Sequence, residues 1–170
     1  GIYDPAYFSQ MQGMRVVSPS NFSELEYWLE KLVTEGHGPR AIRYPRGVEA
    51  QSLAQLPCTG NTFDIVQQAP NAHVALVSYG SEVENILHAA SLLTQKGIAV
   101  DVIKLLQIHP LPTAFLESLR TYNTILFAEE CIQNGGIGEH TAMALYTNGW
   151  RGEWVGVSVP NVGIPHGSVE

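Results

Sequence analysis

The later, larger part of the chain alternates short apolar runs with segments whose apolar residues recur every three or four positions. The apolar runs occupy residues 73–79, 98–103, 124–128 and 154–159. The helical spacing covers residues 81–96, 113–120 and 139–146. The run at 73–79 is nearly continuous, as in strands that are buried on both faces. This alternation predicts an open, mostly parallel, doubly wound α/β sheet with helices on both faces.

Local signals refine this region. Ser81 and Glu84 have the spacing of a capping box, which predicts a helix that begins there and ends before Gly97. Residues 63–67 alternate apolar and polar positions and are expected to form an edge strand. Residues 105–112 contain two prolines and are expected to form a turn region.

The first part of the chain shows a shorter strand, helix, strand pattern. Residues 14–18 predict a strand, and Asn21 is placed to cap a helix with Glu24 three residues later. Residues 40–44 predict the second strand, which implies parallel pairing and a right-handed crossover. Residues 4–12 lack a clear period and are expected to form a helical turn or a loop.

The pattern loses its period between the two regions. Turn-forming residues gather at 48–62, which predicts a linker there. We therefore expect one unit at 1–47 and another at 63–170.

Charge and composition narrow the class of protein. The net charge is −7 and no run of basic residues occurs, which argues against a nucleic-acid-binding protein. No apolar stretch approaches the about 20 residues of a membrane span. The beginning lacks both a methionine and signal-peptide features, so we expect a processed product or a piece of a longer protein. Cys58 and Cys131 lack metal-site spacing and are expected to be free thiols in a reducing compartment.

Arg46 is the main candidate for binding chemistry. Pro45 ends the strand and restricts Tyr44, and Gly47 permits a sharp turn. A guanidinium held between such residues presents a planar fork of donors to a phosphate or carboxylate. The simpler interpretation is a solvated surface arginine after a strand.

Two acidic or glycine-rich segments are weaker candidates. The Gly135–Gly138 turn precedes a helix and could expose N–H groups to an anion, although close packing is the commoner reason for such glycines. Glu129 and Glu130 end a strand where doubly wound sheets bind ligands. Adjacent residues of a strand point in opposite directions, so we expect hydrogen bonds to loop N–H groups, or an interface, rather than a catalytic pair.

The histidines do not indicate a metal site. No two of the six show the i, i+4 spacing of a helical zinc motif. His109 and His166 are expected to be structural or solvated rather than general bases. The chain also lacks a Gly-x-Ser-x-Gly elbow and a Walker loop, which removes support for serine acyl transfer and ordinary nucleotide hydrolysis.

Several runs together resemble the 1-deoxy-D-xylulose-5-phosphate synthase family, thiamine-diphosphate enzymes of the transketolase superfamily. The most specific is Arg43-Tyr44-Pro45-Arg46-Gly47. The resemblance covers nearly the whole chain, through residues 1–4, 14–20, 41–47, 74–80, 104–112, 128–130, 135–138 and 164–167. It implies that residues 1–47 are the end of the pyrimidine-binding domain and that residues 63–170 are a transketolase-like C-terminal domain.

The resemblance also implies a reaction and its components. In this family pyruvate and glyceraldehyde 3-phosphate are condensed with the help of thiamine diphosphate and Mg²⁺ in a cytoplasmic (or plastid) homodimer. Arg46 matches the arginine that grips the acceptor's phosphate. The family's histidine motif, activating glutamate and Gly-Asp-Gly metal motif are missing from these residues, and Pro112 replaces the usual Asp. No catalytic, cofactor or metal residue is therefore assigned, and the fragment alone is expected to be inactive and to bind no cofactor.

Two other interpretations stay open. Transketolase itself and the β-type subunit of a 2-oxo-acid dehydrogenase share the C-terminal domain. A non-catalytic α/β protein that binds a small anion or mediates dimerisation, using the Gly135 loop, belongs to a different class.

Overall fold

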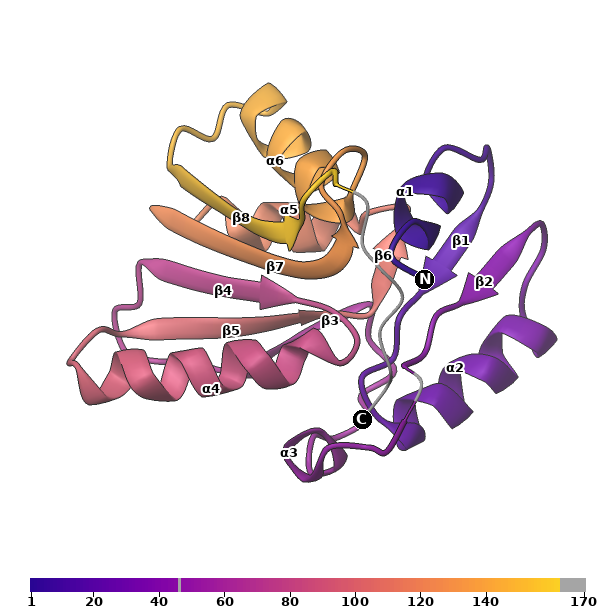
Figure 1. Cartoon of the computed structure of the whole chain (residues 1–170), viewed down its shortest axis with the longest axis horizontal. Helices are drawn as coiled ribbons and strands as arrows, with labels where there is room; N and C mark the ends of the chain where they lie inside the picture. The colour runs from indigo at the N-terminus through magenta and orange to yellow at the C-terminus, as the bar shows by residue number, and fades with distance from the viewer. Residues whose placement is uncertain (46, 163–170) are drawn as a thin grey trace.

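The computed structural model describes residues 1–45 and 47–162. The elements follow in the order α1 (Asp4–Phe8), β1 (Arg15–Val17), α2 (Phe22–Thr34), β2 (Arg40–Ile42), α3 (Gln51–Ala54), β3 (Phe63–Gln67), β4 (Val74–Ser78), α4 (Glu82–Gln95), β5 (Val100–Leu105), β6 (Gln107–His109), α5 (Thr113–Leu119), β7 (Thr124–Ile132), α6 (Ile137–Thr147) and β8 (Glu153–Val159). Figure 1 shows that they form two sheets.

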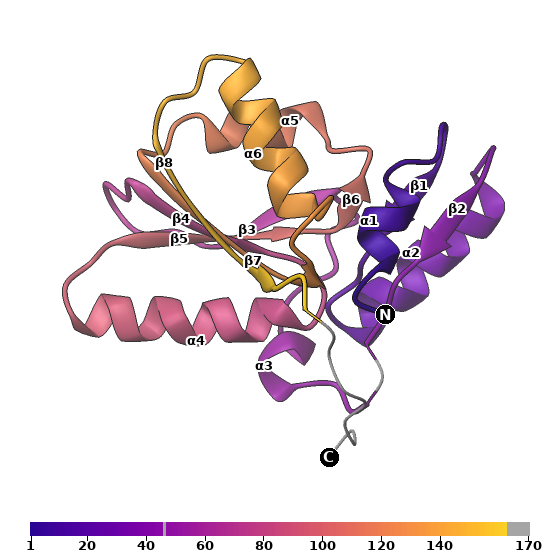
Figure 2. The ribbon, with the colours of Figure 1, turned by 45° about the horizontal axis from the view of Figure 1, so that its top comes forward.

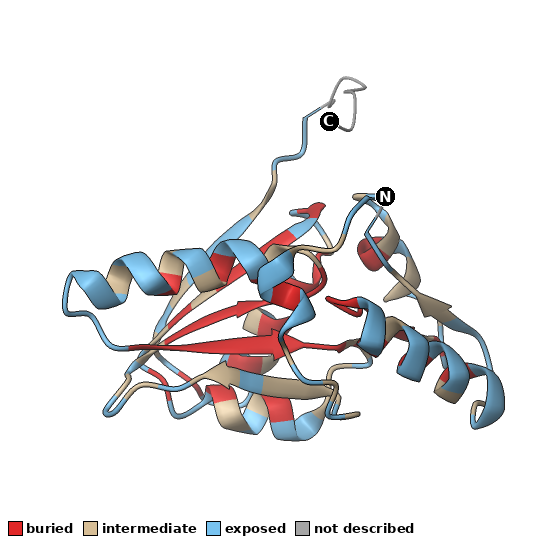
Figure 3. Ribbon diagram, turned by 90° about the horizontal axis from the view of Figure 1, so that it is seen from below, coloured by how far each residue is buried: buried red, intermediate tan, exposed pale blue. Residues whose placement is uncertain are grey.

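The larger sheet has five strands in the order β3-β5-β4-β7-β8. Every pairing is parallel except that of β3 with β5, so the mostly parallel α/β sheet and the edge strand at 63–67 are confirmed. Helix α4 covers one face, and α5 and α6 cover the other (Figure 2). The strands carry the core: β5 is buried along its whole length, and Figure 3 shows the central strands in the buried class.

The smaller sheet has three strands in the order β2-β1-β6. Strands β1 and β2 pair in parallel, as the sequence predicts, with α2 as the crossover. Strand β6 pairs antiparallel with β1, placing His109 opposite Val16 and Gln107 opposite Val17. The prediction of a turn region at 105–112 is therefore wrong for its central residues, because a partner about ninety positions earlier in the chain supplies their pairing.

The two predicted helix caps have different outcomes. The Asn21 side chain accepts a hydrogen bond from the Glu24 N–H at 2.9 Å, so the α2 cap is confirmed. The prediction of a capping box at Ser81 is wrong. Ser81 has helical dihedral angles, φ −66° and ψ −26°, and its side chain makes no capping hydrogen bond. A capping residue needs the extended backbone that Asn21 has.

The remaining features complete the description. Residues 4–8 of the first segment are helical, and the 48–62 segment contains the short helix α3. Cys58 and Cys131 are both free, and Cys131 is buried, which raises the pKa of its thiol to about 11. Within the described residues, no helix combines the length and the apolar character that crossing a bilayer requires.

Candidate functional site

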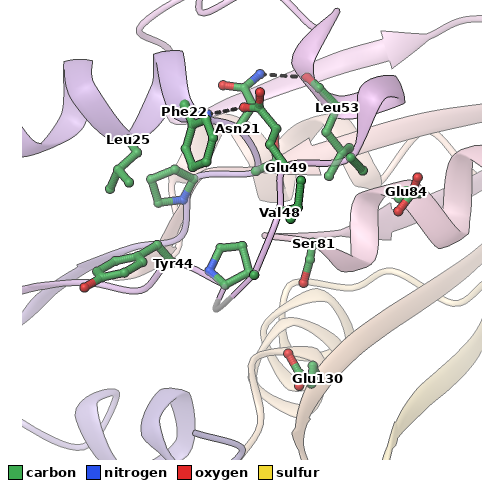
Figure 4. A pocket seen from close by; sticks show the side chains of 15 residues that line it. Asn21, Phe22, Leu25, Tyr44, Val48, Glu49, Leu53, Ser81, Glu84 and Glu130 are labelled. Atoms are coloured by element: carbon green, nitrogen blue, oxygen red, sulfur yellow. Dashed lines mark hydrogen bonds between the residues drawn. The ribbon is translucent and has the colours of Figure 1, made fainter. Parts of the chain in front are cut away.

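A cavity of about 350 Å³ lies between the first part of the chain and the beginning of α4. Tyr44, Pro45 and residues 47–50 form one side of it, and residues 19–22 at the beginning of α2 form another. Ser81 and Glu84 of the α4 region and Glu130 of β7 complete the wall, as Figure 4 shows. The cavity thus combines residues that are far apart in the chain.

Hydrogen bonds from α2 hold the apolar part of this wall. The Asn21 amide donates to the carbonyl oxygens of Leu53 at 2.9 Å and Leu56 at 3.0 Å. Because Leu53 belongs to α3, the same residue that caps α2 also fixes the segment opposite (Figure 4). Phe22, Tyr44 and Val48 add apolar surface to the wall that is more than half exposed.

Three carboxylates face the cavity. Glu49 accepts a hydrogen bond from the Phe22 N–H, and Glu84 accepts one from the Ser52 hydroxyl at 3.0 Å. Glu130 lies 3.5 Å from the Arg43 guanidinium. None of the described lining residues is a lysine or an arginine. An anion in this cavity would therefore need a positive charge from another source.

Arg46, the main predicted binding residue, lies outside the described residues. Its neighbours Tyr44, Pro45 and Gly47 all line the cavity. Its role in phosphate binding stays a prediction.

Arg43 is a residue that the sequence analysis did not single out. Its guanidinium donates to the Glu130 carbonyl oxygen at 3.1 Å and lies 5.9 Å from the centre of the Tyr79 ring. It therefore joins the end of β2 to the carboxyl ends of β4 and β7, beside the cavity. The sequence offered one signal for its role: Arg43 lies at the end of a predicted strand, two residues before Pro45.

Glu129 fills the N-terminal end of α6. Its carboxylate accepts hydrogen bonds from the N–H groups of Ile137 and Gly138, both at 3.0 Å, and from the Tyr79 hydroxyl at 2.8 Å. Burial raises the pKa of this carboxyl, while these hydrogen bonds oppose the shift. A Cβ atom at Gly136 would lie 2.5 Å from Glu129 Oε1.

The Gly135–Gly138 turn consequently binds the protein's own carboxylates. The Gly135 N–H donates to the Glu139 carboxylate at 2.6 Å, and the buried N–H groups of Ile137 and Gly138 donate to Glu129. Close packing against Glu129 is the reason for Gly136 and Gly138, whereas Gly135 has a φ of 76° that favours glycine. Glu129 bonds to loop N–H groups, as the sequence analysis expected. Glu130 is exposed and lies beside Arg43, whereas Glu129 is buried with Tyr79 and the α6 amides, so the two do not form a dyad.

The histidines do not converge with the carboxylates. His109 lies on β6, where burial and nearby His140 lower the pKa of its imidazole. His166 lies outside the described residues. Across residues 1–45 and 47–162, no group of three histidine, cysteine or carboxylate side chains could hold a metal ion.

Comparison with known proteins gives a consistent relationship. Residues 64–170 match the family described as "Transketolase, C-terminal domain". The 1-deoxy-D-xylulose-5-phosphate synthase 1 of Geobacter sulfurreducens is 32% identical over all of this chain, which covers 26% of that protein. The 1-deoxy-D-xylulose-5-phosphate synthase of Lachnoclostridium phytofermentans is 29% identical over 98% of the chain and 27% of its own length.

A solved structure shares the fold over nearly the whole chain. It is described as a split gene transketolase, an inactive beta4 tetramer, and superposes with a TM-score of 0.74 at 26% identity. The match covers 95% of this chain and 53% of that chain. The likeness extends well beyond residues 64–170, so it includes the smaller sheet.

Proposed function

The chain belongs to the family of transketolase C-terminal domains, and from this premise we propose that it is the C-terminal part of a 1-deoxy-D-xylulose-5-phosphate synthase. The observation that carries the proposal is that synthases of this name match 98–100% of the chain, including the region before residue 64. The chain spans about a quarter of the length of these relatives. The synthase activity belongs to the longer protein.

In that protein, pyruvate and glyceraldehyde 3-phosphate would be condensed to 1-deoxy-D-xylulose 5-phosphate, a precursor in isoprenoid, thiamine and pyridoxal biosynthesis. Thiamine diphosphate would supply the site at which pyruvate loses carbon dioxide. We expect a cytoplasmic homodimer, and the tetramer named for the similar transketolase structure supports self-association.

The described residues do not fit the cofactor or its metal. Apart from Arg46, which we assign to the acceptor, the described lining of the cavity includes no lysine or arginine that could bind a diphosphate. No cluster of potential metal ligands occurs among the described residues. The groups that hold thiamine diphosphate and Mg²⁺ therefore belong to the rest of the longer protein, and this chain alone should not catalyse.

The role we assign to this chain is to position the phosphorylated acceptor through Arg46. The segment on both sides of Arg46 lines the cavity, and the described lining offers an anion no lysine or arginine. A bidentate guanidinium would bind the phosphate and so align the aldehyde for attack, which is a positioning effect.

Substitution of Arg46 in the longer enzyme tests this role. We expect Arg46→Ala to raise the KM for glyceraldehyde 3-phosphate about 30- to 150-fold, corresponding to about 2–3 kcal/mol for a lost charged contact. The KM for pyruvate should change little. Steady-state kinetics with each substrate varied in turn provide the measurement.

Arg151→Ala serves as the control, because Arg151 lies in the turn between α6 and β8, with its guanidinium on the carbonyl oxygens of Tyr146 and Trp150. Equal increases in both KM values for Arg46→Ala would contradict the assignment. For the 170-residue chain alone, calorimetry with thiamine diphosphate and Mg²⁺ should show no binding, and micromolar binding would overturn the division of roles.

A transketolase is the second candidate, favoured by the solved structure of that description. The two differ in their donor substrate. A longer protein that uses a ketose phosphate donor and releases no carbon dioxide would establish the transketolase alternative.

A further inference from the structure

Lys104 is a charged residue in the middle of a buried strand. It belongs to β5, and only 1% of its side chain is exposed. Its ammonium group pairs with the carboxylate of Glu24, a residue of α2 that is also 1% exposed, and lies 3.6 Å from Asp64 of β3. The buried ammonium group therefore contacts one carboxylate from the helix of the smaller sheet and one from a strand of the larger sheet.

Glu24 extends this contact to the wall of the cavity. Its second oxygen accepts hydrogen bonds from both the N–H and the hydroxyl of Ser20, each at 2.8 Å. Ser20 and Asn21 line the cavity, and the Asn21 amide holds the carbonyl oxygens of α3 and its following turn. A continuous series of polar contacts thus leads from Lys104 to two sides of the cavity.

Asp64 extends the contact to the connecting segment. Its carboxylate accepts hydrogen bonds from the Thr59 hydroxyl at 2.8 Å and from the Asn61 amide at 3.0 Å. The segment between α3 and β3 is consequently tied to the same lysine. Lys104 lies where the first unit, the connecting segment and the larger sheet meet.

Stability alone does not account for such a group. Two buried charges lose their hydration, and apolar residues of similar volume often stabilise a protein equally well. A buried ion pair instead favours one relative placement of the two elements that carry the charges, because an apolar replacement packs without a preferred partner. Removing one partner leaves an uncompensated buried charge, which is strongly destabilising.

We propose that Lys104 is a positioning residue, which orients α2 through Glu24 so that residues 20–22 lie opposite Ala50 and Leu53 in the wall of the cavity. It does not contact a substrate. Its relevance to phosphate binding depends on the proposed function, whereas its effect on the geometry of the cavity does not.

The test uses the 170-residue chain and two kinds of variant. Lys104→Met should lower the midpoint of thermal unfolding by about 10 °C, because Glu24 is left buried without its partner. The double variant Glu24→Gln with Lys104→Met keeps an acceptor for the N–H and hydroxyl of Ser20 and should recover a midpoint close to that of the unaltered chain. Exposed Glu26→Gln on α2 and Lys96→Met after α4 provide matched controls and should change nothing.

Amide hydrogen exchange of the double variant separates positioning from simple stabilisation. We expect amides in residues 20–25 and 50–56 to exchange at least tenfold faster than in the unaltered chain, and those of β4 and β7 to be unchanged. Unaltered exchange at 20–25 and 50–56 in a stable double variant would overturn the proposal.

The same double substitution in the longer enzyme should raise the KM for the phosphorylated acceptor and leave kcat largely intact. The Arg46→Ala measurement tests the phosphate site separately. If it leaves that KM unchanged, the proposed function fails, and hydrogen exchange still decides the role of Lys104.

Discussion

The two sheets differ in how completely the chain covers them. The five-stranded sheet has helices on both faces, and Glu129 from its own β7 fills the N-terminal end of α6. The three-stranded sheet takes β6 from the later part of the chain, and its helix α2 leaves Leu29 and Val33 at least half exposed. The cavity is built mainly by the less complete region. The larger sheet therefore acts as the support, and the smaller region supplies most of the cavity wall.

This difference predicts that the smaller region has little stability of its own. Met14 and Val16 of this region share the buried cluster of the larger sheet. Trp28, which is 1% exposed, packs with Val17, Leu32 and Leu106 in a second, smaller cluster. Leu106 lies directly after β5, so this cluster joins the two regions.

The largest expected effect comes from Trp28→Ala. We expect a loss of about 3–5 kcal/mol in the free energy of unfolding, because a fully buried indole is removed. A single transition should remain in urea denaturation followed by circular dichroism, because the regions unfold together. Leu29→Ala, at the next and half-exposed position, should change stability by less than about 0.5 kcal/mol. Two separate transitions in the unaltered chain would show that the smaller region is independent.

An intermediate effect is expected at the helix caps, where the two regions are directly comparable. Asn21→Ala should cost about 1–2 kcal/mol, because Asn21 caps α2 and also holds α3. Ser81→Ala at the beginning of α4 should cost less than about 0.5 kcal/mol, because Ser81 forms no cap bond. Chemical denaturation of both variants provides the measurement, and equal losses would contradict the geometry of these two helix ends.

The smallest effect concerns pH and the larger sheet. Burial raises the pKa of Glu129 in the folded protein. Such an acid binds its proton more tightly when folded, so its contribution to stability is complete below the ordinary pKa of about 4.3 and is lost as pH rises through the folded value. Glu129→Gln should remove this pH dependence.

Denaturation curves from pH 4 to 8 compare the slopes of the two proteins, with Glu117→Gln, exposed on α5, as the control. We expect the difference in unfolding free energy between the unaltered chain and Glu129→Gln to fall as pH rises. A difference that grows with pH would show that the hydrogen bonds of Glu129 outweigh its burial.

Periodicity was sufficient for the regular elements because each depends on local spacing. The run at 73–79 contains β4, and the apolar spacing after Ser81 contains α4. The parallel pairing of β1 with β2 followed from a single crossover helix. The division at 48–62 stays a prediction, and the family match begins at residue 64.

The features that escaped prediction depend on contacts between distant residues. The pairing of β6 with β1, and of Lys104 with Glu24, joins residues 80 or more positions apart. One signal was available for the second, since a lysine within the apolar run at 102–106 must find a buried partner. The Ser81 error had another cause: the spacing of a capping box does not specify the backbone angles that the cap requires.

The antiparallel partner that β6 provides to β1 also constrains how this chain can be recombined with its relatives. A chimaera joined in the 48–62 segment would combine β1 from one parent with β6 from another, although the two must match in register and in the Arg15–Gln107 hydrogen bond of 2.9 Å. Exchange of this domain among transketolase-like enzymes therefore requires that residues 107–109 come from the same parent as β1, although the joint separates them in the sequence.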